Sequence, residues 1–134
     1  MSDNEAILFA NEAFYAAFAR RDADAMDGVW DHRDAVTCIH PGWPPIGGRD
    51  QVMESWRAIF GNPDSPTIRA SHATVQVLID AAYVVCYESI DDGFMVATNL
   101  FVRQGKAWGM VHHQAGMAPR PTDLDAIAAP NTFQ

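Results

Sequence analysis

A change in hydrophobic periodicity near residue 67 constrains the fold of this chain more than any other feature of the sequence. Before that point, apolar residues recur three or four positions apart, which is typical of helices; after it, apolar and polar residues alternate, which is typical of strands. Helices followed by a series of strands indicate an α+β protein with helices packed on an antiparallel sheet. The 134 residues are enough for one domain with its own core. We predict such a domain over residues 1–118 and an irregular, proline-containing tail over residues 119–134.

Two helices are predicted before residue 31. Ser2-Asp3-Asn4-Glu5 has the S-x-x-E form of a capping box, in which the serine and the glutamate satisfy free N–H groups at the start of a helix. Asp22 is a suitable N-cap for a second, shorter helix whose buried face includes Met26 and Trp30. The basic pair Arg20-Arg21 between the two helices is expected to be a solvated helix end.

The segment from residue 35 to residue 61 predicts a strand, a loop and a third helix. Ala35–His40 is typical of a short strand, whereas Pro41–Gly48 contains too many prolines and glycines for regular structure. The apolar residues of Val52–Phe60 have helical spacing, and Gly61 is a suitable end for that helix.

Four strands are predicted after residue 66, over Thr67–Ile79, Tyr83–Ile90, Phe94–Arg103 and Ala107–Met117. The Asp92-Gly93 pair between the middle two runs is typical of a hairpin turn. A two-residue turn at this pair would place Asn99 opposite Cys86 and Glu88 opposite Ala97 on one face of the sheet. A three-residue loop would instead turn Tyr87 toward that face.

The third of these strands predicts a partner for the sheet. Met95, Ala97 and Phe101 alternate along it with Val96 and Leu100, so that both faces of the strand are apolar. The helices can cover only one face, and a twofold axis would let the other face cover itself. We therefore expect a homodimer that forms through the back of the sheet.

The charge and composition exclude several classes of function. The chain has 17 acidic and 9 basic residues, a formal net charge of −8 that disfavours nucleic-acid binding. It contains no run of the roughly 18 uncharged apolar residues that a membrane span requires. Because residues 1–5 lack the features of a secretion signal, we expect a cytoplasmic protein. Cys38 and Cys86 are then expected to be reduced thiols, too few and too far apart for a zinc site.

A set of polar residues is predicted on the concave face of the sheet. On the last strand, Met110, His112 and Gln114 share one face, while Val111 and His113 point the other way. With Glu88 and Asn99 also directed inward, four polar side chains would lie among apolar neighbours. Such a set is either a satisfied hydrogen-bond network or a ligand site.

Four segments of the chain resemble the SnoaL-like branch of the NTF2-like superfamily. They are Cys38-Ile39-His40-Pro41-Gly42-Trp43, Ser55-Trp56-Arg57-Ala58-Ile59-Phe60, Ala97-Thr98-Asn99-Leu100-Phe101 and Trp108-Gly109-Met110-Val111-His112-His113. The resemblance covers roughly Glu5 to Met117 and implies a cone-shaped, cystatin-like fold, in which three helices and a curved antiparallel sheet enclose a pocket. It says less about activity, because this fold carries enzymes, ligand binders and interaction modules.

The resemblance also implies roles for individual residues. In the related steroid isomerases, a carboxylate base stands where this chain has His40. A tyrosine that donates to the oxyanion is replaced by Phe14, with Tyr15 next to it, and the neutral carboxylic acid of the oxyanion hole is matched by Asn99. Histidine can accept a proton and asparagine can donate a hydrogen bond, so acid–base chemistry is retained while the steroid reaction itself is not expected.

Each candidate catalytic residue also has a structural interpretation. His40 is a general base or a strand-end side chain satisfied by the backbone of the following turn. His112 with Glu88 is an oriented base or a buried pair that only joins strands. Asn99 contacts a ligand or bridges the sheet.

The predicted ligand-binding residues are mostly aromatic. A wall of aromatic rings suits a flat apolar ligand, although the helical spacing of Trp30 and Trp56 is also typical of core residues. A nucleophilic Cys38 and a metal site at the histidines are not expected, because no ligand spacing supports the metal and a buried thiol is usually inert. The predicted set is Phe14, Tyr15, Trp30, Trp43, Trp56, Phe60, His72, Phe101, Met110 and Gln114.

These observations lead to one leading hypothesis and two alternatives. The leading hypothesis is a pocket that binds a small apolar or aromatic molecule and catalyses cofactor-free proton transfer, as in an isomerase, dehydratase or cyclase. His40 or His112 would act as the base, Glu88 would orient it, and Asn99 would stabilise an oxyanion. The alternatives are a binding module without catalysis and a module for protein interaction.

Overall fold

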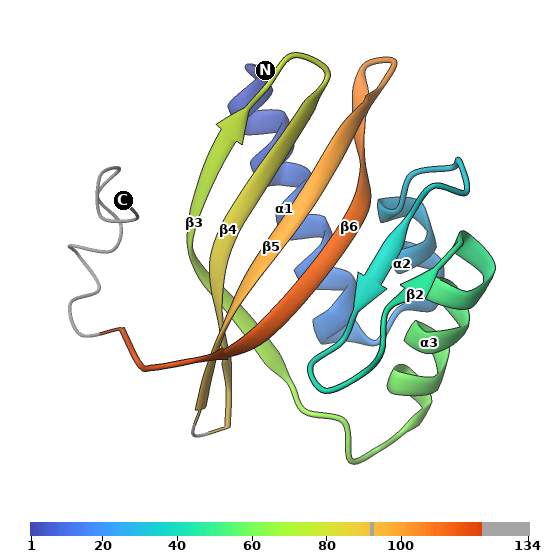
Figure 1. Ribbon diagram of the computed structural model, residues 1–134, viewed down its shortest axis with the longest axis vertical. Coiled ribbons are helices and arrows are strands. Elements are labelled where there is room, and N and C mark those ends of the chain that lie inside the picture. Colours follow the sequence, from blue (N-terminus) through green and yellow to red (C-terminus); the bar gives the residue numbers. More distant parts are fainter. Residues whose placement is uncertain (92, 122–134) are drawn as a thin grey trace.

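The described structure, a computed structural model, covers residues 1–91 and 93–121. Within these residues it contains α1 (Asp3–Arg20), α2 (Ala23–Val29), β1 (Thr37–Ile39), β2 (Ile46–Gly47), α3 (Arg49–Gly61), β3 (Ile68–Val77), β4 (Ala81–Ile90), β5 (Gly93–Gln104) and β6 (Ala107–Ala118). The predicted α+β class is confirmed (Figure 1). Most of the predicted irregular tail, residues 122–134, lies outside the described residues.

Local capping explains where the first two helices begin. The Ser2 hydroxyl accepts a hydrogen bond from the Glu5 N–H at 3.2 Å, and the Glu5 carboxylate accepts from the Ser2 N–H at 3.4 Å, which completes the predicted capping box. Asp22 accepts from the N–H of Ala25 at 3.0 Å and caps α2. In the described part of the chain, no helix is long and apolar enough to cross a bilayer.

The strands of the described residues form one sheet in the order β2-β1-β6-β5-β4-β3. All neighbours are antiparallel except β1 and β6, which run parallel. Ile46 and Gly47 form β2 by pairing with Cys38 and Thr37, although Pro41–Gly48 was predicted to be irregular. That prediction was wrong for these two residues because their strand geometry comes from the edge of β1, not from their own composition.

The hairpin of β4 and β5 differs in register from the prediction but keeps the predicted face. Glu88 lies opposite Met95, and Asn99 lies opposite Val84, each two places from the expected partner. A shift of two residues preserves the alternation of side chains, so Glu88 and Asn99 remain on the concave face. Both are buried, whereas Tyr87 lies half-buried on the other face, which excludes the alternative with Tyr87 inside.

A β-bulge interrupts β6 near its centre. Leu100 pairs with His112 and the next residue, Phe101, pairs with Met110, so Val111 is an extra residue in β6. An inserted residue exchanges the two faces of the strand beyond it. Met110 and His113 therefore both point to the concave face, although they are three residues apart.

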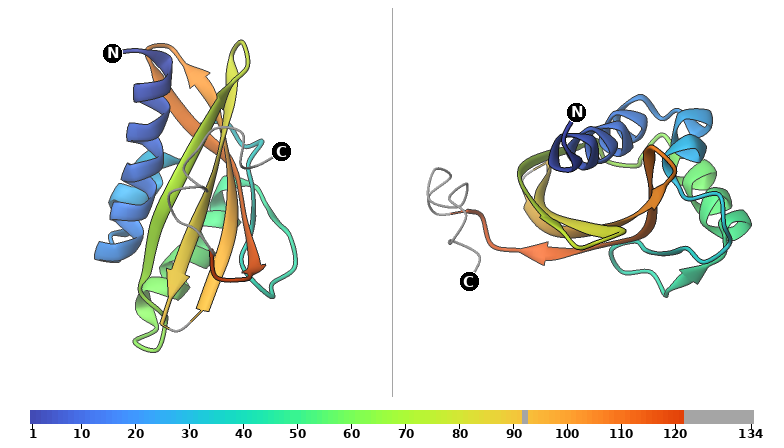
Figure 2. Two further views of the ribbon diagram at one scale, coloured as in Figure 1. Left: turned by 90° about the vertical axis from the view of Figure 1, so that its left-hand side faces the viewer. Right: turned by 90° about the horizontal axis from the view of Figure 1, so that it is seen from above.

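The helices lie on the concave side of a curved sheet. Figure 2 shows β3 to β6 curving around α1, with α2 and α3 at the β6 edge. The largest fully buried side chains fill the space between these layers and include Phe14, Trp30, Trp56 and Phe101. The convex face carries apolar side chains such as Val96 and Leu100, and no described helix lies against it.

Arg21 joins the end of α1 to the end of α3, instead of being solvated as predicted. Its backbone has a φ of 53°, and its guanidinium donates to the carbonyl oxygens of Ile59, Phe60, Asn62 and Ser65 at 2.6–3.4 Å. These carbonyls belong to the last turn of α3 and the segment that follows it. One side chain thus satisfies groups that a helix end leaves without partners.

We expect the Arg21→Met substitution to lower the free energy of unfolding by roughly 2 kcal/mol, because hydrogen bonds made by charged groups contribute about that much. Arg20→Met is the matched control, since Arg20 is exposed and makes only a 3.9 Å contact with Asp22. Urea denaturation of both variants measures the difference. Equal losses in the two variants would contradict this role of Arg21.

Candidate functional site

A pocket of about 490 Å³ lies where α3 and residues 62–66 meet the concave face of the sheet. Its walls are mostly apolar, and its most buried polar side chains are His40, Glu88 and His113, each at most 4% exposed. A smaller hollow of about 280 Å³ on the outer side of α1 is lined by apolar residues and Lys106. Titratable groups that converge in an apolar pocket identify the larger one as the candidate site.

A chain of hydrogen bonds runs behind the pocket from α1 into the sheet. Tyr15 Oη donates to Glu88 Oε2 at 2.6 Å. Asn99 Nδ2 donates to Asn11 Oδ1 at 2.8 Å and to Tyr15 Oη at 3.2 Å, which uses both of its N–H groups. Asn99 Oδ1 lies 2.5 Å from His113 Nδ1 and accepts its proton. In the structure, Asn99 therefore bridges strands and α1 through hydrogen bonds, which corresponds to the structural interpretation of this residue.

This series of hydrogen bonds determines which nitrogen of His113 carries the proton. Because Asn99 Oδ1 can only accept, Nδ1 of the neutral His113 ring is the protonated nitrogen. Nε2 is left with a free lone pair, 4.0 Å from Glu88 Oε2. An unprotonated imidazole nitrogen next to a carboxyl group is suited to moving a proton.

His40 has the opposite tautomer. The Ser55 hydroxyl lies 2.9 Å from His40 Nε2 and donates its own proton to the Val52 carbonyl at 2.6 Å. Ser55 must therefore accept from His40 Nε2–H, which leaves His40 Nδ1 unprotonated. The partner of the His40 side chain is a helix hydroxyl and not the backbone of the turn that follows β1.

Burial shifts the titration of all three pocket groups. Desolvation raises the pKa of Glu88 to about 7, although the Tyr15 hydrogen bond opposes the shift. Desolvation lowers the pKa of His40 to about 4, and desolvation with the charges of nearby histidines lowers the pKa of His113 to about 3. Both imidazoles are thus neutral near pH 7, where the carboxyl group titrates, and the close approach of His113 and Glu88 is not an ion pair.

The two cysteines are buried beside this site. Burial raises the pKa of Cys86 to about 11, and it raises the pKa of Cys38 still further. Cys86 Sγ lies 3.3 Å from Tyr15 Oη, and Cys38 Sγ lies 3.7 Å from His40 Nε2. Such thiols are poor nucleophiles. In the described residues, no group of three His, Cys, Asp or Glu side chains is placed to hold a metal ion.

The comparison with known proteins identifies the family. Residues 7–119 match the model of the SnoaL-like domain. The chain belongs to this family. A crystal structure of a proposed dehydratase of the NTF2-like family from Streptomyces avermitilis is 32% identical, with a TM-score of 0.78 over 87% of this chain and 96% of that one. The predicted NTF2-like, SnoaL-like assignment and its cystatin-like fold are confirmed.

Other relatives of this SnoaL-like chain have different descriptions. A proposed association domain of a calcium/calmodulin-dependent protein kinase type II from Thiobacillus denitrificans is 34% identical, with a TM-score of 0.71 over 81% of this chain and 92% of that one. The F-box protein SKIP8 of Arabidopsis thaliana is 29% identical over 114 residues, which are 84% of this chain and 49% of that protein. The chain therefore spans about half the length of this curated relative.

In this SnoaL-like fold, His112 and Gln114, which were predicted to be site residues on the concave face, lie outside the pocket. His112 Nδ1 lies 2.5 Å from the Thr37 hydroxyl on the convex side, and Gln114 is exposed. The expected orientation of both was wrong because the bulge at Val111 exchanges the faces of β6 beyond it. His113 points into the pocket instead. The only sequence feature that could have suggested this is that two histidines are adjacent, so that one of them faces inward in either register.

Three predicted aromatic residues lie at or just behind the pocket. Trp43 lines it and is 43% exposed, with its ring centroid 4.8 Å from that of His40. Trp56 and Phe14 are fully buried, and their rings support His40 and His113 at centroid distances of 4.7 and 4.8 Å. Trp56 and Phe14 therefore fix the orientation of the imidazoles without lining the cavity themselves.

The remaining predicted aromatic and apolar residues belong to other parts of the domain. Trp30, Phe101 and Met110 are buried in the core, and Phe60 is half-buried against it. His72 lies on β3 with a φ of 58° and lines a separate hollow between α1 and β3. The apolar pocket residues that the sequence analysis missed carry no distinctive motif; they are Phe18, Ile59, Ile68, Ile90, Met95 and Met117.

The hydrogen bond between Asn99 and His113 predicts an observable tautomer. We expect long-range ¹H–¹⁵N NMR correlations at neutral pH to show His113 protonated at Nδ1 and His40 protonated at Nε2. Asn99→Leu removes the acceptor, so the Nδ1–H form of His113 should lose its preference while His40 keeps its own. A wild-type protein with His113 protonated at Nε2 would contradict the assigned network.

Proposed function

We propose that this pocket is the active site of a cofactor-free acid–base enzyme that acts on a small apolar or aromatic molecule, with dehydration as its best-supported reaction. The observation that carries the proposal is the pairing of His113 Nε2, which has a free lone pair, with a Glu88 carboxyl that titrates near neutral pH. The pair combines a base and an acid 4.0 Å apart in an apolar pocket.

Elimination of water uses both members of the pair. His113 Nε2 takes a proton from the carbon next to a carbonyl group, and the electron pair of that C–H bond forms the carbon–carbon double bond. The bond from the neighbouring carbon to its hydroxyl breaks, and protonated Glu88 gives its proton to the departing oxygen, so that water leaves. The proton on His113 then returns to Glu88, which restores the starting state.

Other residues of the network hold the pair in place. Tyr15 fixes one oxygen of Glu88, and Asn99 fixes the tautomer of His113. Because both N–H groups of Asn99 already have partners, it acts as a positioning residue in this proposal and not as the oxyanion donor expected from the sequence. His40, on the same pocket, has a second unprotonated nitrogen, Nδ1, which lies 3.9 Å from Cys38 Sγ.

The similarity to the proposed dehydratase of Streptomyces avermitilis supports this reaction class. It extends over 87% of this chain at 32% identity. Fold alone would not be sufficient support, since one fold carries many functions.

We expect wild-type protein to convert a member of a panel of aromatic β-hydroxy ketones, such as 4-hydroxy-4-phenylbutan-2-one, to the conjugated enone, followed by ultraviolet absorbance. His113→Gln and Glu88→Gln should each lower kcat by at least about 100-fold, since a general acid or base contributes roughly 10²–10⁴. His112→Gln is the matched control and should retain activity. Unchanged turnover in the His113 and Glu88 variants would refute the mechanism.

We also propose that the domain forms a homodimer through the convex face of the sheet. That face carries partly exposed apolar side chains, among them Tyr83, Val85, Val96 and Leu100. Apolar patches of this kind usually mark an interface. The similarity to a proposed kinase association domain supports a role for the fold in assembly, which is also the basis of an alternative, non-catalytic function.

Sedimentation of Leu100→Glu tests this interface. Leu100 is 36% exposed on the convex face, so a charge there should shift the protein from dimer to monomer. Leu78→Glu adds the same charge in the β3–β4 turn, where Leu78 is 60% exposed, and should leave the dimer intact. A wild-type protein that sediments as a monomer at high micromolar concentration would refute the proposal.

A further inference from the structure

The buried polar side chains that line the pocket, His40, Glu88 and His113, have mainly acceptors left for a ligand, whereas the Asn62 amide at the exposed rim also carries donors. His113 Nδ1–H and His40 Nε2–H are already bonded to Asn99 and Ser55, so each ring has an unprotonated nitrogen left to offer, and that of His40 lies 3.9 Å from Cys38 Sγ. Glu88 accepts from Tyr15 and has further acceptor capacity in its carboxylate form. A ligand that reaches these groups therefore meets two lone pairs and a carboxyl group.

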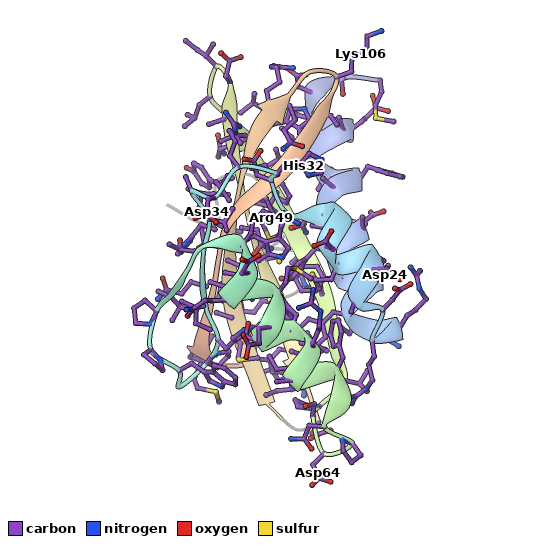
Figure 3. All side chains as sticks on the ribbon, turned by 90° about the vertical axis from the view of Figure 1, so that its right-hand side faces the viewer. Asp24, His32, Asp34, Arg49, Asp64 and Lys106 are labelled. Atoms are coloured by element: carbon purple, nitrogen blue, oxygen red, sulfur yellow. The ribbon has the colours of Figure 1, made fainter. Side chains whose placement is uncertain are left out.

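The described lining of the pocket contains no cationic side chain. No Lys or Arg is among the described residues that line it, whereas two acidic residues, Glu88 and Asp64, line it. The nearby guanidinium of Arg21 is bound to carbonyl oxygens of the α3 end, and Arg49 is bound to the carbonyls of Trp30 and Asp31. Figure 3 shows Lys106 at the opposite end of the molecule from Asp64.

We propose that the pocket selects an uncharged molecule that carries a hydroxyl group as a hydrogen-bond donor, and that it rejects carboxylates and phosphates. The hydroxyl hydrogen meets an acceptor at His113, His40 or Glu88. A ligand with only acceptors would place its lone pairs against those of the pocket, and a buried anion would find no Lys or Arg among the described lining residues. The inference rests on the proposed function for the location of the site, but not for the reaction.

One pocket group changes this selectivity with pH. Protonated Glu88 gains a donor, and the pKa of its carboxyl group is about 7. The titratable groups packed around it are Tyr15, Cys86, Cys38 and His113. The pKa of the Tyr15 hydroxyl and of the Cys38 thiol is raised above its usual range, that of Cys86 is about 11 and that of His113 about 3. Between pH 6 and pH 8, Glu88 is thus the member of this group that titrates.

A matched set of naphthalenes tests the inference by isothermal titration calorimetry. The probes are 2-naphthol, which has a donor, 2-methoxynaphthalene, which has only an acceptor, and 2-naphthoate, an anion. At pH 8 we expect 2-naphthol to bind about tenfold more tightly than either of the others, the factor that one unsatisfied buried hydrogen bond represents. At pH 6 the preference over the ether should become smaller, because protonated Glu88 can donate to its oxygen.

Two variants sharpen the test. Glu88→Gln supplies a permanent N–H donor, so the preference for the naphthol over the ether at pH 8 should be reduced. Ala58→Lys adds a cation at an exposed position of α3 that lines the pocket, and it should raise the affinity for 2-naphthoate. Gln51→Lys adds the same charge on α3 away from the pocket and should not.

The inference is overturned if the ether or the naphthoate binds wild-type protein at pH 8 as tightly as 2-naphthol, or if 2-naphthol does not bind at millimolar concentration. None of the probes can lose water, so the result is independent of turnover. A retained naphthol preference with failed turnover would refute only the proposed reaction. Turnover without the preference would refute only this inference.

Discussion

The hydrogen bonds among Asn11, Tyr15, Glu88, Asn99 and His113 connect α1 to three neighbouring strands inside a largely apolar core. All five side chains are at most 7% exposed, so water cannot replace a missing partner. A buried polar group without a partner costs about 1–3 kcal/mol, and a displacement of any one strand would leave several such groups. The network therefore fixes the relative positions of the helix and the sheet, and with them the shape of the pocket.

The same network determines the chemical character of the pocket. It uses the protons of Tyr15, Asn99 and His113 Nδ1 within the core, and Ser55 similarly engages His40 Nε2–H. What remains toward the pocket is lone pairs and one carboxyl group. The same hydrogen bonds thus have two effects. They satisfy the buried polar groups of the core, and because they use the donors of these side chains, they leave mainly acceptors directed toward the pocket.

The sequence was sufficient to predict the layers of this fold and part of the site. Periodicity identified the helices and strands, and Ser2 and Asp22 gave the starts of two helices because capping is local chemistry. Glu88 and Asn99 were placed on the correct face despite a wrong register, since a shift of two residues preserves alternation. A register error of two residues therefore leaves the same side chains on each face of the strand.

What the sequence could not predict depends on contacts between distant segments. The bulge at Val111 exchanges His112 and His113, and a β-branched residue in a strand gives no local sign of it. Arg21 next to Arg20 is typical of a solvated helix end, and only the position of the α3 end explains why it is bound. Single inserted residues and long-range side-chain contacts therefore limited the prediction of the site more than the assignment of helices and strands did.

The ionisation of Glu88 is what favours an active site over a purely structural network. Its carboxyl has a raised pKa in the folded protein, so the stabilising effect of protonation is complete below the unfolded pKa of 4.5 and is lost as pH rises through about 7. Above that pH the folded state carries a cost of roughly 3 kcal/mol. A glutamine at this position would accept the same hydrogen bond from Tyr15 without any cost of ionisation. A carboxyl group that weakens the fold near neutral pH, beside an imidazole with an unprotonated nitrogen, supports the proposed proton transfer, because packing alone does not require a carboxyl group at this position.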